Sequence, residues 1–142
     1  MASDDRPVPA PDELIRLAVA YSAAVDRVTH DGGASIDELM AFFAEDAMRI
    51  AISNDGAPVV AAGAEAIRQS FLRRTEQRQA VALKGVEVWG DQVVCRLERA
   101  EAGFAQPGLT HNIRVLLVKG GKIRRLVVLV DSEEFARLRA PV

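Results

Sequence analysis

The chain has 142 residues, which suits one domain with a core that needs no disulfides or metals to hold it. Hydrophobic residues make up 49% and charged residues 27%, an ordinary globular balance, and the net charge of −2 argues against a nucleic-acid-binding protein. The one cysteine, Cys95, excludes an internal disulfide and favours a reducing compartment, so we expect a cytoplasmic protein.

The N-terminal segment is acidic and rich in proline, and it lacks the basic and apolar regions of a secretory signal. We expect residues 1–10 to be a disordered lead-in and residues 11–142 to form a single domain. No apolar run approaches the ~18 residues of a membrane-spanning helix, so we expect no membrane partner.

Three helices are predicted in the first half of the chain. Pro11 and the two acids after it favour a helix start, and the apolar spacing continues to Val28. Ser35 and Glu38 match a capping box, which predicts a short helix through Phe43. The third helix is expected after Gly63, with an inner side that consists of Ile67, Phe71 and Leu72.

Strands are predicted between and after these helices. Two short apolar runs flank the turn residues Asn54-Asp55-Gly56 and predict a hairpin. The second half alternates segments rich in Val, Leu and Ile with glycine-containing turns, which is typical of an antiparallel meander. A short helix is expected from Ser132 to Arg139. The expected strands are 47–52, 58–62, 80–89, 92–101, 109–118 and 123–131.

This order predicts an α+β fold in which three helices from the N-terminal half cover a curved, mixed or antiparallel sheet. A curved sheet that is covered in this way forms a cone, whose apolar pocket would admit a small hydrophobic molecule at its mouth.

Three local stretches carry a resemblance to a known family: FFAEDAM at 42–48, AAGAEAIRQSF at 61–71 and KGGKIRRL at 119–126. In this order they resemble the nuclear-transport-factor-2-like superfamily, also called SnoaL-like or ketosteroid isomerase-like. The resemblance is nearest to its polyketide and polyether cyclases and to limonene epoxide hydrolase-like proteins. It implies the cone fold and a homodimer, but no one chemistry, because this fold hosts many activities.

The chemistries of that superfamily fit the sequence unequally. The isomerase pattern places its tyrosine at Tyr21, but its base falls on Ala51 and its second donor near Ile113, so isomerisation is not favoured. The epoxide hydrolase pattern places its water-holding residues at Arg49 and Ala51 and an acid at Val128, so its set is incomplete.

Cyclases that mainly fold an apolar chain need only orientation and one or two polar groups. The resemblance therefore favours an enzyme without a cofactor, a cyclase of polyketide-type antibiotic biosynthesis whose ring closure could be pericyclic. One alternative is an epoxide hydrolase or epoxide-opening cyclase that uses Glu98, with Arg96 beside it, and a second acid. The other alternative is a non-catalytic ligand-binding or dimerisation module.

The candidate residues each have a structural alternative, such as a core tyrosine, a helix-capping acid or a hairpin-end tryptophan. His111 and Ile113 are expected to share an inward strand face, and it stays open whether Arg49 faces inward. No grouping has metal-ligand spacing. The candidate catalytic residues are Tyr21, Glu65, Glu98, His111 and Asp131, and the candidate substrate-binding residues are Arg49, Ala51, Trp89, Ile113 and Val128.

Overall fold

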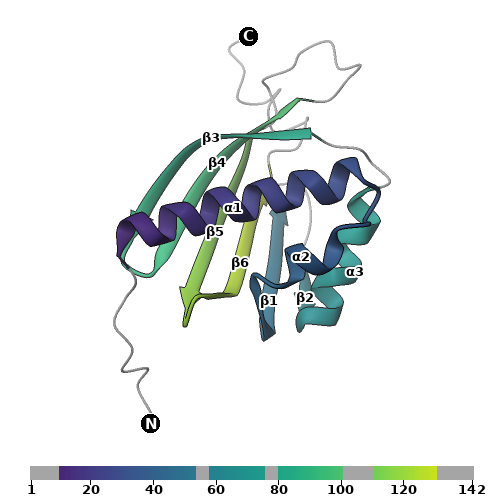
Figure 1. The fold of residues 1–142 in the computed structure, drawn as a ribbon, viewed down its shortest axis with the longest axis horizontal. Helices are drawn as coiled ribbons and strands as arrows, with labels where there is room; N and C mark the ends of the chain where they lie inside the picture. The colour runs from purple at the N-terminus through teal and green to yellow at the C-terminus, as the bar shows by residue number, and fades with distance from the viewer. Residues whose placement is uncertain (1–9, 54–57, 76–79, 101–110, 131–142) are drawn as a thin grey trace.

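The computed structural model describes residues 10–53, 58–75, 80–100 and 111–130. Within these ranges the elements follow the order α, α, β, β, α, β, β, β, β (Figure 1). The helices are α1 (Pro11–His30), α2 (Ile36–Met40) and α3 (Ala64–Thr75); the strands are β1 (Phe43–Ser53), β2 (Val59–Ala62), β3 (Ala80–Trp89), β4 (Gln92–Ala100), β5 (His111–Lys119) and β6 (Lys122–Val130).

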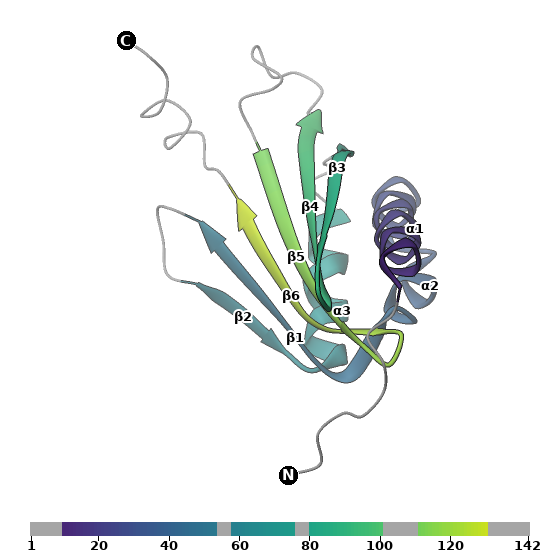
Figure 2. The same cartoon turned by 90° about the vertical axis from the view of Figure 1, so that its left-hand side faces the viewer.

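The strands form one six-stranded sheet in the order β2-β1-β6-β5-β4-β3. Neighbouring strands are antiparallel except β1 and β6, which pair in parallel, so the sheet is mixed. Figure 2 shows the strands fanning out as a curved sheet with α1 on one side. The α+β prediction is confirmed, including the three helices from the first half of the chain.

The helices pack on one face of this sheet, which we call the inner face. Helix α1 lies against β3 and β4, and α3 lies against β1. The apolar side of α1 is buried, as its spacing predicts, and Ile67 and Phe71 of α3 are buried as well. This packing places the main core between the helices and the inner face.

Two predictions about the short second helix are wrong in detail. Ser35 is the N-cap residue, as predicted, but it makes no side-chain cap hydrogen bond because its backbone is not extended. Glu38 pairs with Arg27. The helix also ends at Met40, and β1 begins at Phe43. The backbone explains this early start: the amide of Ile123 donates to the carbonyl of Phe42 at 2.7 Å.

Strand β1 is irregular in its first half, where its register with β6 shifts between Phe43 and Met48. The amide of Gly63, at the start of α3, donates to the carbonyl of Ala47 at 2.8 Å and ties the helix to this strand. The terminal helix predicted from Ser132 to Arg139, and residues 1–9 of the lead-in predicted at 1–10, lie outside the described residues.

Candidate functional site

The inner face of the sheet carries the buried side chains of every central strand. Residues that are register partners on neighbouring strands form rows across this face. In one row Ala51 pairs with Val128, Val128 with Arg114, and Arg114 with Cys95. The neighbouring row runs from Arg49 through β6 to β5. The buried residues of this face are Ala47, Arg49, Val93, Cys95, Leu97, Arg114, Leu116, Val118, Ile123, Leu126 and Val128.

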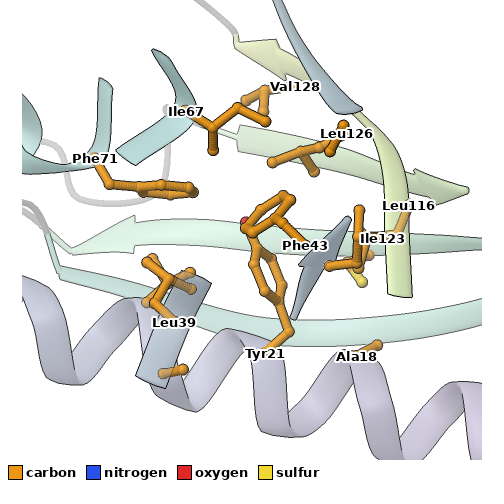
Figure 3. Close-up of a cluster of buried hydrophobic side chains, with 14 of the residues drawn as sticks. Ala18, Tyr21, Leu39, Phe43, Ile67, Phe71, Leu116, Ile123, Leu126 and Val128 are labelled. Carbon is orange, nitrogen blue, oxygen red and sulfur yellow. The ribbon is translucent and has the colours of Figure 1, made fainter. Parts of the chain in front are cut away.

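Aromatic rings pack against one another between α1 and this face. Tyr21 of α1 packs edge-on against Phe42 and Phe43, with ring centroids 5.8 and 5.7 Å apart. Phe71 of α3 lies 6.0 Å from Phe43. Figure 3 shows Tyr21 and Phe71 approaching Phe43 from their two helices. The candidate Tyr21 is therefore a buried residue within an aromatic cluster, and its hydroxyl is the polar group at the end of that ring.

Arg49 lies on the inner face of the sheet, a placement that the alternation of residues along the strand could not predict. Its side chain is only 8% exposed, and its guanidinium carbon lies 5.6 Å from the centroid of the Phe71 ring. Burial lowers the pKa of Arg49; the nearby Tyr21 raises it, and the charge of Arg114 lowers it further. The opposite face of β1 carries Met48 and Ile52, which are exposed.

Arg114 is a second inward-facing cation that the sequence analysis did not select. It is 1% exposed, and none of its three guanidinium nitrogens has a hydrogen-bond partner among the described residues. Sequence alternation pointed to the wrong face of β5: Arg114, Leu116 and Val118 are buried, whereas Ile113 and its face are only half-buried. The sequence feature that could have identified Arg114 is its position as a single cation within the apolar run 113–118.

Cys95 lies beside Arg114 in the register and is a free, buried thiol. Burial raises the pKa of this thiol to about 11, although the charge of Arg114 acts in the opposite direction. Its burial fits strand alternation, because Val93, Cys95 and Leu97 are all buried on the inner face.

We expect the folded protein to resist thiol reagents at pH 8, because about one thiol in a thousand is ionised three pH units below its pKa. Labelling with a chromogenic disulfide should be slow in buffer and rapid in urea. The pKa of the Cys95 thiol is 9.0 ordinarily and about 11 in the folded protein. The free energy of unfolding should therefore fall as the pH rises from 9.0 to about 11, because the thiol ionises more readily in the unfolded chain. Rapid labelling in buffer would contradict the buried placement.

Four of the predicted site residues lie together on the inner side. Tyr21, Arg49 and Val128 are buried, and Ala51 is half-buried next to Val128. Their positions bring together α1, β1 and β6, of which β6 is far from the other two in the sequence. Whether they bind a substrate stays a prediction.

Three other predicted residues lie away from this group. Glu65 is exposed in the first turn of α3, where its carboxylate accepts a hydrogen bond from the Gln69 amide at 3.1 Å. Trp89 is 68% exposed, and its indole donates to Glu87 at 3.2 Å. Ile113 lies on the opposite strand face from Arg114, so the expected inward face of β5 is corrected.

The remaining acid–base candidates are described only in part. Glu98 and His111 are register partners on β4 and β5, but their side chains are outside what the structure describes. Asp131 lies outside the described residues. Their proposed roles therefore stay predictions from the sequence.

The described residues contain no group of three or more His, Cys, Asp or Glu side chains placed to hold a metal ion. None of the helices in the described ranges is long and apolar enough to cross a membrane. The polar or charged residues buried in the same ranges are Arg49, Ser70 and Arg114.

Neither protein-family models nor curated proteins gave a significant match to this chain. Solved structures did. A protein from Sinorhizobium meliloti described as a candidate polyketide cyclase is 21% identical, with a TM-score of 0.61, covering 84% of this chain and 94% of its own. A nuclear-transport-factor-2-like protein of unknown function from Mesorhizobium loti is 16% identical, with a TM-score of 0.68, covering 89% of this chain and 98% of its own.

A de novo designed protein with a curved β-sheet is also similar, at 17% identity and a TM-score of 0.66, with 92% of this chain and 93% of the design covered. The chain thus has the nuclear-transport-factor-2-like fold. A scaffold shared with a designed protein specifies no chemistry by itself, so function has to be argued from the inner face.

Proposed function

We propose that this protein, on its nuclear-transport-factor-2-like scaffold, binds a hydrophobic small molecule between the helices and the inner face of the sheet. We further propose that it is a cofactor-independent cyclase of polyketide-type natural-product biosynthesis, located in the cytoplasm. The observation that carries the proposal is the composition of the inner face. Apart from Arg49 and Arg114, apolar and aromatic side chains line it, and no carboxylate is buried among the described residues.

Such a face favours catalysis by orientation over catalysis by acid–base pairs. Holding a flexible chain in a reactive shape can lower a barrier by roughly 7–11 kcal/mol in the best cases, because entropy is lost before the reaction. Apolar walls also exclude water, which strengthens any polar contact within them. The Tyr21 hydroxyl is the group that we assign to polarise a substrate carbonyl.

The reaction can be tested with linear polyketide-like carboxylic acids and with their thioesters, each in several chain lengths, in ¹⁸O-labelled water, with products followed by mass spectrometry. Ring closure gives a product that is isomeric with its substrate or has lost water, without labelled oxygen. Hydrolysis of an epoxide analogue would instead add one labelled oxygen and would favour the epoxide hydrolase alternative. No turnover of any substrate would contradict the enzyme proposal.

The variant Tyr21→Phe keeps the aromatic packing and removes the hydroxyl. We expect kcat to fall by about 10²-fold with little change in KM, as for the loss of one preorganised donor. The matched control is Lys84→Gln on the exposed surface of β3, which should leave both constants unchanged. Equal kinetics for Tyr21→Phe and the native protein would remove Tyr21 from the mechanism.

We also propose that the chain forms a homodimer through the outer face of the sheet, opposite the helices. Ile52 and Leu129 are register partners on that face and are 36% and 39% exposed. Met48 and Val60 extend the same apolar surface over β1 and β2. A contiguous apolar surface of this kind is typical of an interface between protein chains.

Introducing a charge on this surface should prevent dimer formation. We expect Leu129→Lys to be monomeric by analytical ultracentrifugation at micromolar concentrations at which the native protein is dimeric. Val19→Lys on α1 is the control, because Val19 is an exposed apolar residue on another surface and should not affect assembly. A monomeric native protein, or a dimeric Leu129→Lys variant, would contradict this interface.

A further inference from the structure

Two buried cations on the inner face have no described counter-charge. We propose that Arg49 and Arg114 together bind the carboxylate of the ligand, so that the substrate is an apolar carboxylic acid. This inference rests on the proposed function, because it specifies which molecule the same inner face binds. The two arginines come from β1 and β5, on either side of β6.

The burial of these two side chains is costly unless an anion accompanies them. An arginine stays protonated in proteins, and a charge removed from water without a partner loses several kcal/mol of solvation. Arg114 is almost completely buried, and none of its guanidinium nitrogens has a partner among the described residues. The Nε of Arg49 is also unpartnered there, and this side chain contacts the Phe71 ring instead of a carboxylate.

The remaining buried polar residue of the described ranges does not compensate these charges. Ser70 donates its hydroxyl to the carbonyl of Ile67 at 2.6 Å within α3. The described acids whose ion pairs are known lie on the surface, such as Glu38 with Arg27 and Asp46 with Arg124. A ligand anion would supply the missing counter-charge.

The sheet register places the two arginines close enough to act on one group. Arg49 lies opposite Leu126, and Arg114 lies opposite Val128, two residues further along β6. Two strand spacings across and two residues along give about 12 Å between their Cα atoms, which two extended arginine side chains can bridge. Burial is the main cause that lowers the pKa of Arg49, and the charge of Arg114 lowers it further; an anion between the two arginines would relieve their repulsion.

The chemistry of the surroundings favours a carboxylate over a phosphate. A guanidinium binds a carboxylate through two parallel hydrogen bonds, so two arginines satisfy its four lone-pair directions. A phosphate carries more charge and is commonly held by backbone amides at a helix N-terminus. The inner face instead offers two guanidinium groups among Leu126, Val128 and Leu97, which suits one carboxylate on an apolar body.

Calorimetric titration with three probes of one shape tests this inference: 2-naphthoate, methyl 2-naphthoate and 2-naphthyl phosphate. We expect the native protein to bind naphthoate at least tenfold more tightly than the neutral ester. Arg114→Met and Arg49→Met should each weaken naphthoate binding tenfold or more and leave ester binding unchanged. Arg114→Lys keeps the charge but lacks the planar guanidinium, so its affinity for naphthoate should lie between those of the native protein and Arg114→Met. Arg27→Met, at an exposed arginine, should bind like the native protein.

The outcomes separate the inference from the function on which it rests. Equal binding of naphthoate and ester, or naphthoate binding that survives both methionine variants, would overturn the carboxylate site and leave hydrophobic binding intact. Tighter binding of the phosphate than of naphthoate would overturn the choice of anion. No binding of any of the probes would overturn both proposals. Urea unfolding of each variant confirms that the titrated proteins are folded.

Discussion

Replacing Phe43 with alanine is expected to lower the free energy of unfolding by about 3–5 kcal/mol, the usual cost of removing a buried phenyl ring. Phe43 is buried where β1 begins, and its ring contacts both Tyr21 and Phe71. Its loss would leave a cavity that three elements line, and α1, α3 and β1 cannot all move to fill it. Urea denaturation at a fixed protein concentration measures the effect.

Trp89→Ala is the control for this prediction, because it removes a larger aromatic ring from an exposed position. Since Trp89 lies at the turn between β3 and β4 and is mostly exposed, we expect a change within about 0.5 kcal/mol. If Phe43→Ala cost no more than Trp89→Ala, the aromatic cluster would not be part of the core that we describe.

Replacing Arg114 with methionine is expected to raise the free energy of unfolding by about 1–3 kcal/mol. Apolar replacements of buried charged groups are often stabilising, and here the charge has no described partner whose loss would offset the gain. A stability increase combined with weaker carboxylate binding would mark Arg114 as a residue kept for function at a cost in stability.

Arg27→Met serves as the comparison in the same unfolding experiment. Arg27 forms an exposed ion pair with Glu38, and such pairs contribute about 0–1 kcal/mol, so a small loss is expected. A loss of several kcal/mol in Arg114→Met would contradict the account, because it would mean that the native guanidinium is paired.

Much of the fold followed from local patterns in the sequence. The strand predicted at 80–89 matches β3 at both ends, and the helical spacing after Pro11 matches α1. These elements are marked by glycine turns and by regular apolar spacing, which are local signals. The parallel pairing of β1 with β6 joins a strand from the first half of the chain to one from the second half, and no local signal encodes it.

The start of β1 shows where a local signal fails. Phe42 and Phe43 follow a short helical pattern, and the sequence favours their inclusion in it. The hydrogen bond from the Ile123 amide to the Phe42 carbonyl draws this segment into the sheet instead. A partner some eighty residues away thus decides the structure of this segment.

The candidate site was only partly predictable for a related reason. Both faces of β5 are apolar, so alternation could not show that Arg114 faces inward and Ile113 outward. The same ambiguity existed in β1, where Arg49 lies between exposed Met48 and half-buried Ile50. Buried arginines are rare, and a sequence pattern that assumes apolar residues inside overlooks them.

Two candidate residues from the sequence lie away from the inner face in the fold. Glu65 and Trp89 are both exposed, and each has its own hydrogen-bond partner. The inner face instead presents Tyr21, Arg49 and Arg114. Its polar groups are thus a phenol and two guanidiniums, a set suited to binding and polarising an acidic, apolar molecule.

Arginine side-chain NMR offers the most direct test of that central claim. In a ¹H–¹⁵N correlation of the arginine Nε–Hε groups, the signals of Arg49 and Arg114 can be assigned from their methionine variants. Addition of 2-naphthoate should shift these two signals and leave those of exposed arginines such as Arg27 and Arg124 in place. If naphthoate shifted only the exposed arginines, or none, the inner face would not be the site of carboxylate binding.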